Sequence, residues 1–144
     1  MLRQVSELCK RFGIPEDVFD RLAFSLTQET VFMAAPEVMR FDAVRPLRRG
    51  IRLCRVFPHS VKPTTWAMQV LGKHATRNRI DLDEIQARQL VNGTQLEVEA
   101  EPEVENGFVI ITCCGFVVGV GLYKRPVLKS QIPKFRPVER TTPG

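Results

Sequence analysis

The chain has 144 residues, of which 44% are hydrophobic and 26% charged, and its net charge is +5, values typical of one globular domain with or without a small N-terminal addition. It contains no apolar run near the roughly 18 residues that cross a membrane, and its first residues lack the apolar core of a secretory signal. Its four cysteines lack Cys-x-x-Cys spacing, so we expect no metal site and the reduced thiols of a cytoplasmic protein.

The N-terminal segment predicts short helices followed by a hairpin. Residues 3–12 place apolar side chains at helical spacing and precede Gly13, a common helix terminator, and a second helix is expected after Pro15. Two short β-prone runs, 24–26 and 30–34, flank a polar turn, which favours a hairpin.

Residues 51–57 alternate between apolar and polar side chains and predict a strand. Strict alternation puts Leu53 and Arg55 on one face and Arg52 on the other. Because each face then carries an arginine, we expect this strand at a sheet edge or exposed on one side.

The middle of the chain predicts helix, strand and helix. Residues 63–73 are expected to form a helix with Trp66 in the core, and residues 79–82 a short strand. Asp83 is a typical N-cap for a helix through residue 91, in which we expect Ile85 and Leu90 to be buried.

Two extended segments follow. Glutamates occupy every second position from Glu97 to Glu105, which predicts a charged edge strand that resists edge-to-edge pairing. A metal site is the less favoured interpretation of these glutamates. Residues 108–113 and 116–122 are rich in Val, Ile and Phe and flank Cys114-Gly115, which predicts a buried hairpin.

Charge is sorted along the chain into blocks. Residues 40–62 hold seven basic residues and one acidic, residues 81–105 eight acidic and one basic, and residues 124–140 six basic and one acidic. Clustered cations favour a polyanionic partner, although solvated faces also carry such blocks. Tyr123 adjoins two cations, and an exposed aromatic ring in such a place can stack on a base while the cations hold phosphate.

No catalytic motif is present in the sequence. A reactive cysteine needs a cationic neighbour or a helix N-terminus, whereas Cys113 and Cys114 end an apolar run, where burial makes a thiol inert. An enzyme that uses Cys113 or His74 is therefore a distant alternative, and we expect no catalytic residue, no cofactor and no enzymatic activity.

Two C-terminal motifs carry a resemblance to a known family. The segment Gly115-Phe116-Val117-Val118-Gly119-Val120-Gly121 and the strip Leu128-Lys129-Ser130-Gln131-Ile132-Pro133-Lys134 resemble the PUA-like RNA-binding domain at the C-terminus of RsmF/Sun-type rRNA cytosine-5 methyltransferases. That family has a Gly-Phe-x-x-Gly turn and a Leu-Lys-Asn-x-x-Pro-Lys strip, in which Ser130 here replaces the Asn. The resemblance implies a mixed-sheet pseudo-barrel that grips structured RNA. It does not imply methyltransferase activity, because the catalytic core is absent from this sequence.

The expected fold is α+β, with an N-terminal helical and hairpin appendage (residues 1–60), a PUA-like mixed β pseudo-barrel (residues 61–137) and a disordered tail (residues 138–144). The expected function is non-catalytic binding of structured RNA, rRNA or tRNA, in RNA modification or ribosome assembly. The alternative is a protein-interaction or adaptor module of such a complex, docking through residues 97–105 or the N-terminal helices. The residues predicted to contact RNA are Lys73, Arg77, Arg79, Tyr123, Lys124, Arg125, Lys129, Lys134 and Arg136.

Overall fold

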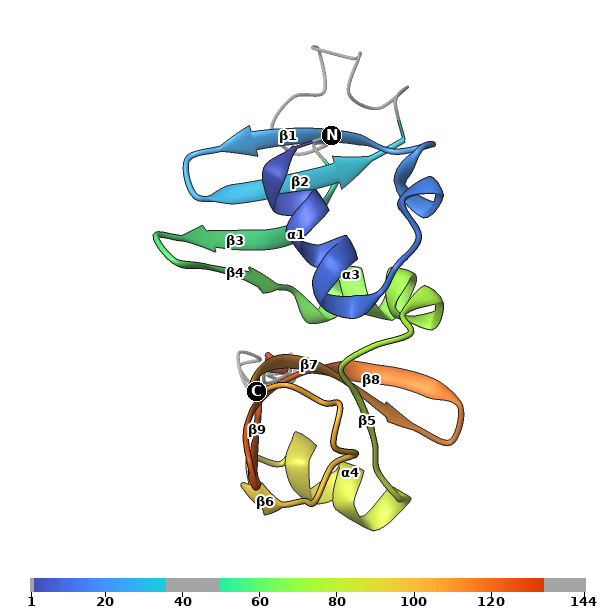
Figure 1. The fold of residues 1–144 in the computed structure, drawn as a ribbon, viewed down its shortest axis with the longest axis vertical. Helices are drawn as coiled ribbons and strands as arrows, with labels where there is room; N and C mark the ends of the chain where they lie inside the picture. Colours follow the sequence, from blue (N-terminus) through green and yellow to red (C-terminus); the bar gives the residue numbers. More distant parts are fainter. Residues whose placement is uncertain (1, 36–49, 134–144) are drawn as a thin grey trace, which may run out of the picture.

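Two β-sheets stacked end to end form the molecule, with a short helix between them (Figure 1). The computed structural model describes residues 2–35 and 50–133. The first sheet is antiparallel, in the order β1 (Ala23–Thr27), β2 (Thr30–Ala34), β3 (Ile51–Phe57) and β4 (Ser60–Pro63). The second sheet is mixed, in the order β5 (Arg79–Asp81), β7 (Gly107–Cys113), β8 (Phe116–Lys124), β9 (Val127–Ser130) and β6 (Leu96–Glu97). The helical segments are α1 (Arg3–Phe12), η1 (Glu16–Phe19), α3 (Thr65–Leu71), η4 (Gly72–His74) and α4 (Glu84–Val91).

Helix α1 has the predicted bounds and the predicted end. Val5, Leu8 and Phe12 recur on one helical face and are buried against the first sheet. Gly13 follows at φ 61°, a left-handed conformation that glycine adopts without a steric penalty. Its amide donates to the carbonyl of Cys9, which satisfies one of the last carbonyls of the helix.

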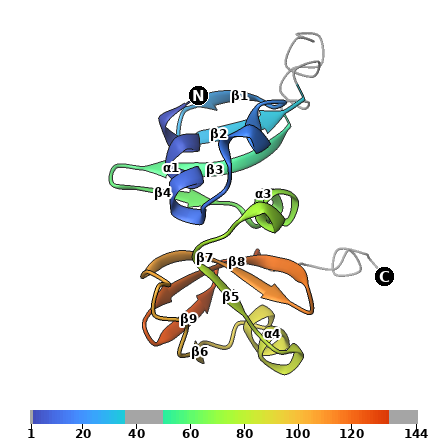
Figure 2. The same ribbon diagram turned by 45° about the vertical axis from the view of Figure 1, so that its right-hand side comes forward.

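Helix α3 lies between the two sheets and is packed against both (Figure 2). Ala67, Met68 and Leu71 are buried in one core with residues of α1, β2 and β3. Ile110 of β7 and Val120 of β8 belong to the same core, so it extends from the first sheet to the second.

The β7–β8 hairpin is the element shared by both halves. One face supplies Ile110 and Val120 to the core around α3, and the other supplies Val109 and Ile111 to a second core with α4 and β9. Successive residues of a strand point to opposite faces, so a strand buried on both sides reads as a continuous apolar run. The predicted buried hairpin is confirmed.

Two expectations for the elements around the second sheet are not met. Helix α4 begins at Asp83 with a full capping box, as the sequence indicates, but Ile85 is exposed and the prediction that it is buried is wrong. The expected acidic strand is paired only at Leu96–Glu97, an edge of the sheet, because the chain then leaves β9.

The N-terminal helix and hairpin and the mixed second sheet, curved into a half-barrel, confirm the α+β class. The division into units of residues 1–60 and 61–137 stays a prediction, and β4 continues the first sheet to Pro63. The predicted disordered tail, residues 138–144, lies outside the described residues.

Candidate nucleic-acid interface

A groove of about 820 Å³ opens where the first sheet meets α3 and the segment after β9. Its walls come from β2, β3 and β4, from the start of α3, and from the two residues Gln131 and Pro133. The lining residues are Thr30, Ile51, Arg52, Arg55, Lys62, Pro63, Thr64, Thr65, Trp66, Gln131 and Pro133. They include three cations and no carboxylate.

A β-bulge in β3 brings two of these cations to one face. Val31 of β2 pairs with Cys54, but the next residue, Phe32, pairs with Arg52, so Leu53 is an extra residue in the ladder. Leu53 and Cys54 are consequently both buried, while Arg52 and Arg55 both line the groove. The prediction that Arg52 and Arg55 lie on opposite faces is wrong, because a shift of one residue reverses every later side chain.

The third cation, Lys62, comes from the neighbouring strand. Lys62 of β4 is the direct partner of Arg55, which in turn pairs with Thr30 of β2 on its other side. Opposed residues on one sheet face have Cβ atoms about 4.5–5.5 Å apart, a distance at which like charges repel. Two cations placed this way are stabilised by an anion between them.

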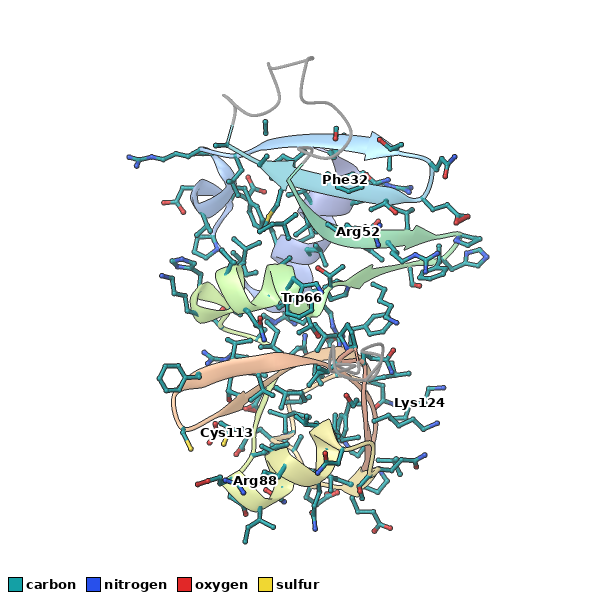
Figure 3. All side chains as sticks on the ribbon, turned by 180° about the vertical axis from the view of Figure 1, so that it is seen from behind. Phe32, Arg52, Trp66, Arg88, Cys113 and Lys124 are labelled. Atoms are coloured by element: carbon teal, nitrogen blue, oxygen red, sulfur yellow. The ribbon has the colours of Figure 1, made fainter. Side chains whose placement is uncertain are left out.

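Trp66 stands at the same groove and is exposed. In α3 the buried positions are Thr65, Ala67, Met68 and Leu71, and Trp66 and Val70 are exposed on the other side of the helix. Trp66 is 58% exposed, and Figure 3 places it at the junction of the two sheets, beneath Arg52. The prediction that Trp66 belongs to the core is wrong, because Met68 and Leu71 fill the space between the sheets.

Thr64 and Thr65 fix the start of α3 in the groove wall. The Thr64 hydroxyl accepts a hydrogen bond from the Ala67 amide and donates to the Arg52 carbonyl, which ties the helix to β3. The Thr65 hydroxyl accepts from the Val120 amide of β8 at 3.1 Å. The position of Trp66 is therefore set by both sheets.

The C-terminal strip reaches the groove through a close approach at Gly119. A Cβ at Gly119 would lie 2.6 Å from Cγ1 of Ile132, so only glycine lets the strip pack on β8. The backbone amide of Gln131 donates to the Val120 carbonyl at 2.9 Å, which holds Gln131 in the groove wall.

Six of the residues predicted to contact RNA are exposed: Lys73, Arg77, Arg79, Lys124, Arg125 and Lys129. None of them lines the groove described above. Arg79 donates one hydrogen bond to the Ala75 carbonyl. Lys134 and Arg136 lie outside the described residues. That these residues bind RNA stays a prediction.

Arg125 holds the acidic segment in place. Its guanidinium donates to the carbonyls of Ala100, Glu101 and Val104, at 3.0, 3.1 and 2.8 Å. Three backbone hydrogen bonds orient this side chain toward its own chain, which leaves it a weak candidate for a phosphate contact.

The buried position of Tyr123 contradicts its predicted role in RNA binding. Its ring is fully buried in the second core, and its hydroxyl donates to the Val98 carbonyl at 2.6 Å and accepts from the Ala100 amide at 3.2 Å. A ring without exposed surface cannot stack on a base, so the prediction of base stacking by Tyr123 is wrong. It reaches the core because β8 continues to Lys124 and alternation turns Tyr123 inward.

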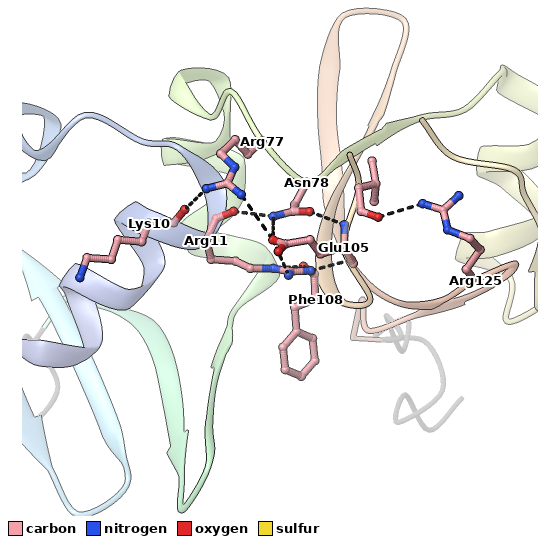
Figure 4. Close-up of polar contacts among 8 residues, drawn as sticks. Lys10, Arg11, Arg77, Asn78, Glu105, Phe108 and Arg125 are labelled. Carbon is pink, nitrogen blue, oxygen red and sulfur yellow. Dashed lines mark hydrogen bonds and ion pairs between the residues drawn. The ribbon is translucent and has the colours of Figure 1, made fainter. Parts of the chain in front are cut away.

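Arg77 belongs to a polar cluster that joins α1 to the second sheet (Figure 4). Its guanidinium donates to the Lys10 carbonyl at 3.2 Å and pairs with the Glu105 carboxylate at 3.5 Å. The same carboxylate accepts from Arg11 at 3.4 Å and from Asn78 at 3.3 Å. Burial lowers the pKa of Arg11, and the Glu105 carboxylate opposes that shift. Arg77 is thus already engaged within the chain.

The four cysteines differ in reactivity, since only Cys114 is exposed. A hydrogen bond between the Cys113 and Cys114 sulfurs, 3.3 Å apart, together with burial, raises the pKa of Cys113 to about 11. Burial raises the pKa of Cys54 to about 12, and that of Cys9 is also raised. These shifts disfavour the thiolate that a nucleophile requires.

We therefore expect one of the four thiols to react rapidly with an aromatic disulfide reagent at mildly alkaline pH. Cys114→Ala should remove this fast phase and leave only the slow reaction that follows unfolding. The rate of thiol release measures this, with Cys9→Ala as the matched control. A fast phase that persists in the Cys114→Ala variant would contradict the buried positions of the other three thiols.

In residues 2–35 and 50–133, no group of three or more His, Cys, Asp or Glu side chains is arranged to hold a metal ion. Among the same residues, no helix is long and apolar enough to cross a membrane.

Two comparisons with known proteins found similarities, one to a family model and one to a solved structure. The family model of the methyltransferase RsmF PUA domain matches residues 77–136. A solved structure described as a conserved PUA domain protein from Thermoplasma acidophilum is similar over 85% of this chain and 74% of its own, with a TM-score of 0.55 and 14% sequence identity. A search of curated proteins finds no match. The matched residues and the common fold together show that this chain contains a PUA-like domain.

Proposed function

We propose that this chain binds structured RNA without catalysing a reaction on it. PUA domains are in general RNA-binding modules, and the RsmF-type domain is linked to rRNA methyltransferases. The observation that carries the proposal is the groove in which Arg52, Arg55 and Lys62 meet with no carboxylate among the lining residues. Such a concave cationic surface attracts phosphate, and its affinity comes from the release of counterions.

The proposed RNA is rRNA or tRNA, and the proposed setting is RNA modification or ribosome assembly in the cytoplasm, with or without a partner enzyme. The groove cations would hold one part of the RNA backbone. A second group of phosphate contacts is proposed for the other predicted cations, of which Arg77 and Arg125 are the weakest candidates because they bind their own chain. This group comprises Lys73, Arg77, Arg79, Lys124, Arg125, Lys129, Lys134 and Arg136.

The test is a titration with unfractionated tRNA, used as a generic structured RNA, at two salt concentrations. The triple variant Arg52→Ala, Arg55→Ala and Lys62→Ala should bind about 10–100-fold more weakly than wild type. The slope of log binding constant against log salt concentration should become shallower by roughly 2 to 3. The loss follows from three missing phosphate contacts on side chains that line the groove.

A matched control removes the same charge elsewhere. Arg3, Lys10 and Arg21 are exposed cations of the N-terminal segment that do not line the groove. Their triple alanine variant changes the net charge equally and should keep most of the affinity. Equal losses in both variants, or wild-type binding that does not respond to salt, would contradict an RNA site in the groove.

The adaptor alternative rests on a different surface. Glu97, Glu99, Glu101 and Glu103 are exposed on the segment that Arg125 holds against β8. If tRNA does not bind, and a basic peptide binds wild type but not a variant with these acids changed to Gln, the adaptor function would be favoured.

A further inference from the structure

The groove beside α3 combines the cations on which the RNA proposal rests with an exposed aromatic side chain that the proposal does not require. Its cations have no carboxylate partner, since no ion pair to Arg52, Arg55 or Lys62 occurs within residues 2–35 and 50–133. Next to them stands Trp66, a large aromatic side chain with more than half of its surface exposed. Free cations beside an exposed ring are the combination with which proteins hold unpaired nucleotides.

We propose that this groove binds an unpaired nucleotide, with the base stacked on Trp66 and the flanking phosphates held by Arg52, Arg55 and Lys62. The inference rests on the proposed RNA-binding function and names the part of the RNA that the groove receives. The ligand is single-stranded RNA at a loop, bulge or end, adjoining a structured region.

The dimensions of the groove suit a ligand of this size. A volume of about 820 Å³ falls within the roughly 300–1,000 Å³ of pockets that hold small organic ligands. Bases inside an A-form helix are stacked on one another and show only their edges, so an indole ring can stack only on a base that has left the helix. An intact duplex can reach the groove with its phosphates but cannot use Trp66.

The position of Trp66 is rigid enough for this role. The Thr64 and Thr65 hydroxyls tie the start of α3 to β3 and to β8. Helical neighbours of Trp66 are buried between the two sheets, so the ring is presented from a packed helix and not from a loop. A stacking surface held in advance loses little conformational entropy when the base arrives.

Arg55 has an additional contact that favours this geometry. Its guanidinium lies 5.6 Å from the ring centre of Phe57. A cation–π contact of this length holds the guanidinium over the strand face and leaves its hydrogens available to an anion. Gln131 also lines the groove; its side-chain amide donates one hydrogen bond to the Ser130 carbonyl at 3.1 Å, and its side-chain oxygen can accept from the edge of the base.

Trp66 is the single tryptophan of the chain, so its fluorescence reports on the groove directly. The probes are a blunt-ended RNA duplex and the same duplex with a short single-stranded overhang of uridines or adenosines. We expect the overhang duplex to quench Trp66 fluorescence and to bind roughly tenfold or more tightly than the blunt duplex. The blunt duplex should bind through its backbone with little quenching.

Variants separate stacking from general charge. Trp66→Ala should make the two duplexes bind equally, and Trp66→Phe should restore part of the preference, because phenylalanine also stacks. Both variants should keep the fold, since more than half of the Trp66 side chain is exposed. Phe116→Ala is the matched control, an exposed aromatic residue at the β7–β8 turn that does not line the groove, and it should change nothing.

The outcomes distinguish this inference from the proposed function. If both duplexes bind wild type equally and without quenching, and Trp66→Ala has no effect, the unpaired-nucleotide site is overturned while RNA binding stands. If neither duplex binds, the proposed function fails as well. Equal quenching by polyglutamate would overturn the nucleotide assignment in favour of an acidic protein partner.

Discussion

Tyr123→Ala is expected to lower the free energy of unfolding by about 4 kcal/mol, the largest effect we predict for a single substitution. The ring is fully buried in the core with α4 and β9, and its removal leaves a cavity there. It also leaves the Val98 carbonyl and the Ala100 amide without their partner. Urea unfolding followed by circular dichroism measures this loss. The dependence of the unfolding free energy on urea concentration should be unchanged.

Tyr123→Phe separates the ring from the hydroxyl. Phenylalanine keeps the packing and loses only the two hydrogen bonds, so we expect a loss of about 1–2 kcal/mol. RNA binding by this variant should equal that of wild type under conditions where both are folded. If Tyr123→Ala kept the wild-type unfolding midpoint but bound RNA less tightly, Tyr123 would be a binding residue and its buried position would be contradicted.

Asn78→Ala is expected to lower the free energy of unfolding by about 3 kcal/mol. The buried Asn78 amide donates to the Arg11 carbonyl at 2.6 Å and to Glu105, and its oxygen accepts from the Glu105 amide at 2.8 Å. The residue also has φ 55°, a left-handed conformation that asparagine tolerates better than alanine. The substitution therefore loosens the connection between α1 and the second sheet.

Asn78→Gly is the matched control that separates the effect of the positive φ from the loss of the side-chain hydrogen bonds. Glycine adopts the positive φ freely but makes no side-chain hydrogen bond, so it should be more stable than the alanine variant by about 1 kcal/mol and remain well below wild type. Thermal and urea unfolding of the three proteins give both differences. If all three unfold at the same midpoint, the polar cluster around Glu105 does not stabilise this junction.

Several elements could be predicted from the sequence because their signals are local. Helix α1 follows from its apolar spacing and Gly13, and helix α4 from the Asp83 cap. The β7–β8 hairpin follows from two β-prone runs around Cys114-Gly115, both of which have positive φ in the turn. Each of these signals acts within a few residues, so no knowledge of the rest of the chain is needed.

Only part of the candidate site could be predicted from the sequence. The basic composition of residues 40–62 pointed to a polyanion, but the predicted contact residues lay elsewhere, and Arg52, Arg55, Lys62 and Trp66 were not among them. An arginine at each of two positions three apart in a strand was the signal available. It indicates one face only if a bulge separates the two residues.

The sequence by itself thus determined the locally signalled elements, the α+β class and the cationic character of the chain, but not strands β4 and β9 or the short extent of β6. Only the tertiary structure decided which side chains face solvent. The bulge at Leu53 depends on how β3 pairs with β2, and the exposure of Trp66 depends on which face of α3 packs between the sheets. Tyr123 and Arg125 are turned to their own chain because residues 98–104 return to β8. These outcomes follow from contacts between segments distant in sequence, which local propensity and periodicity do not encode.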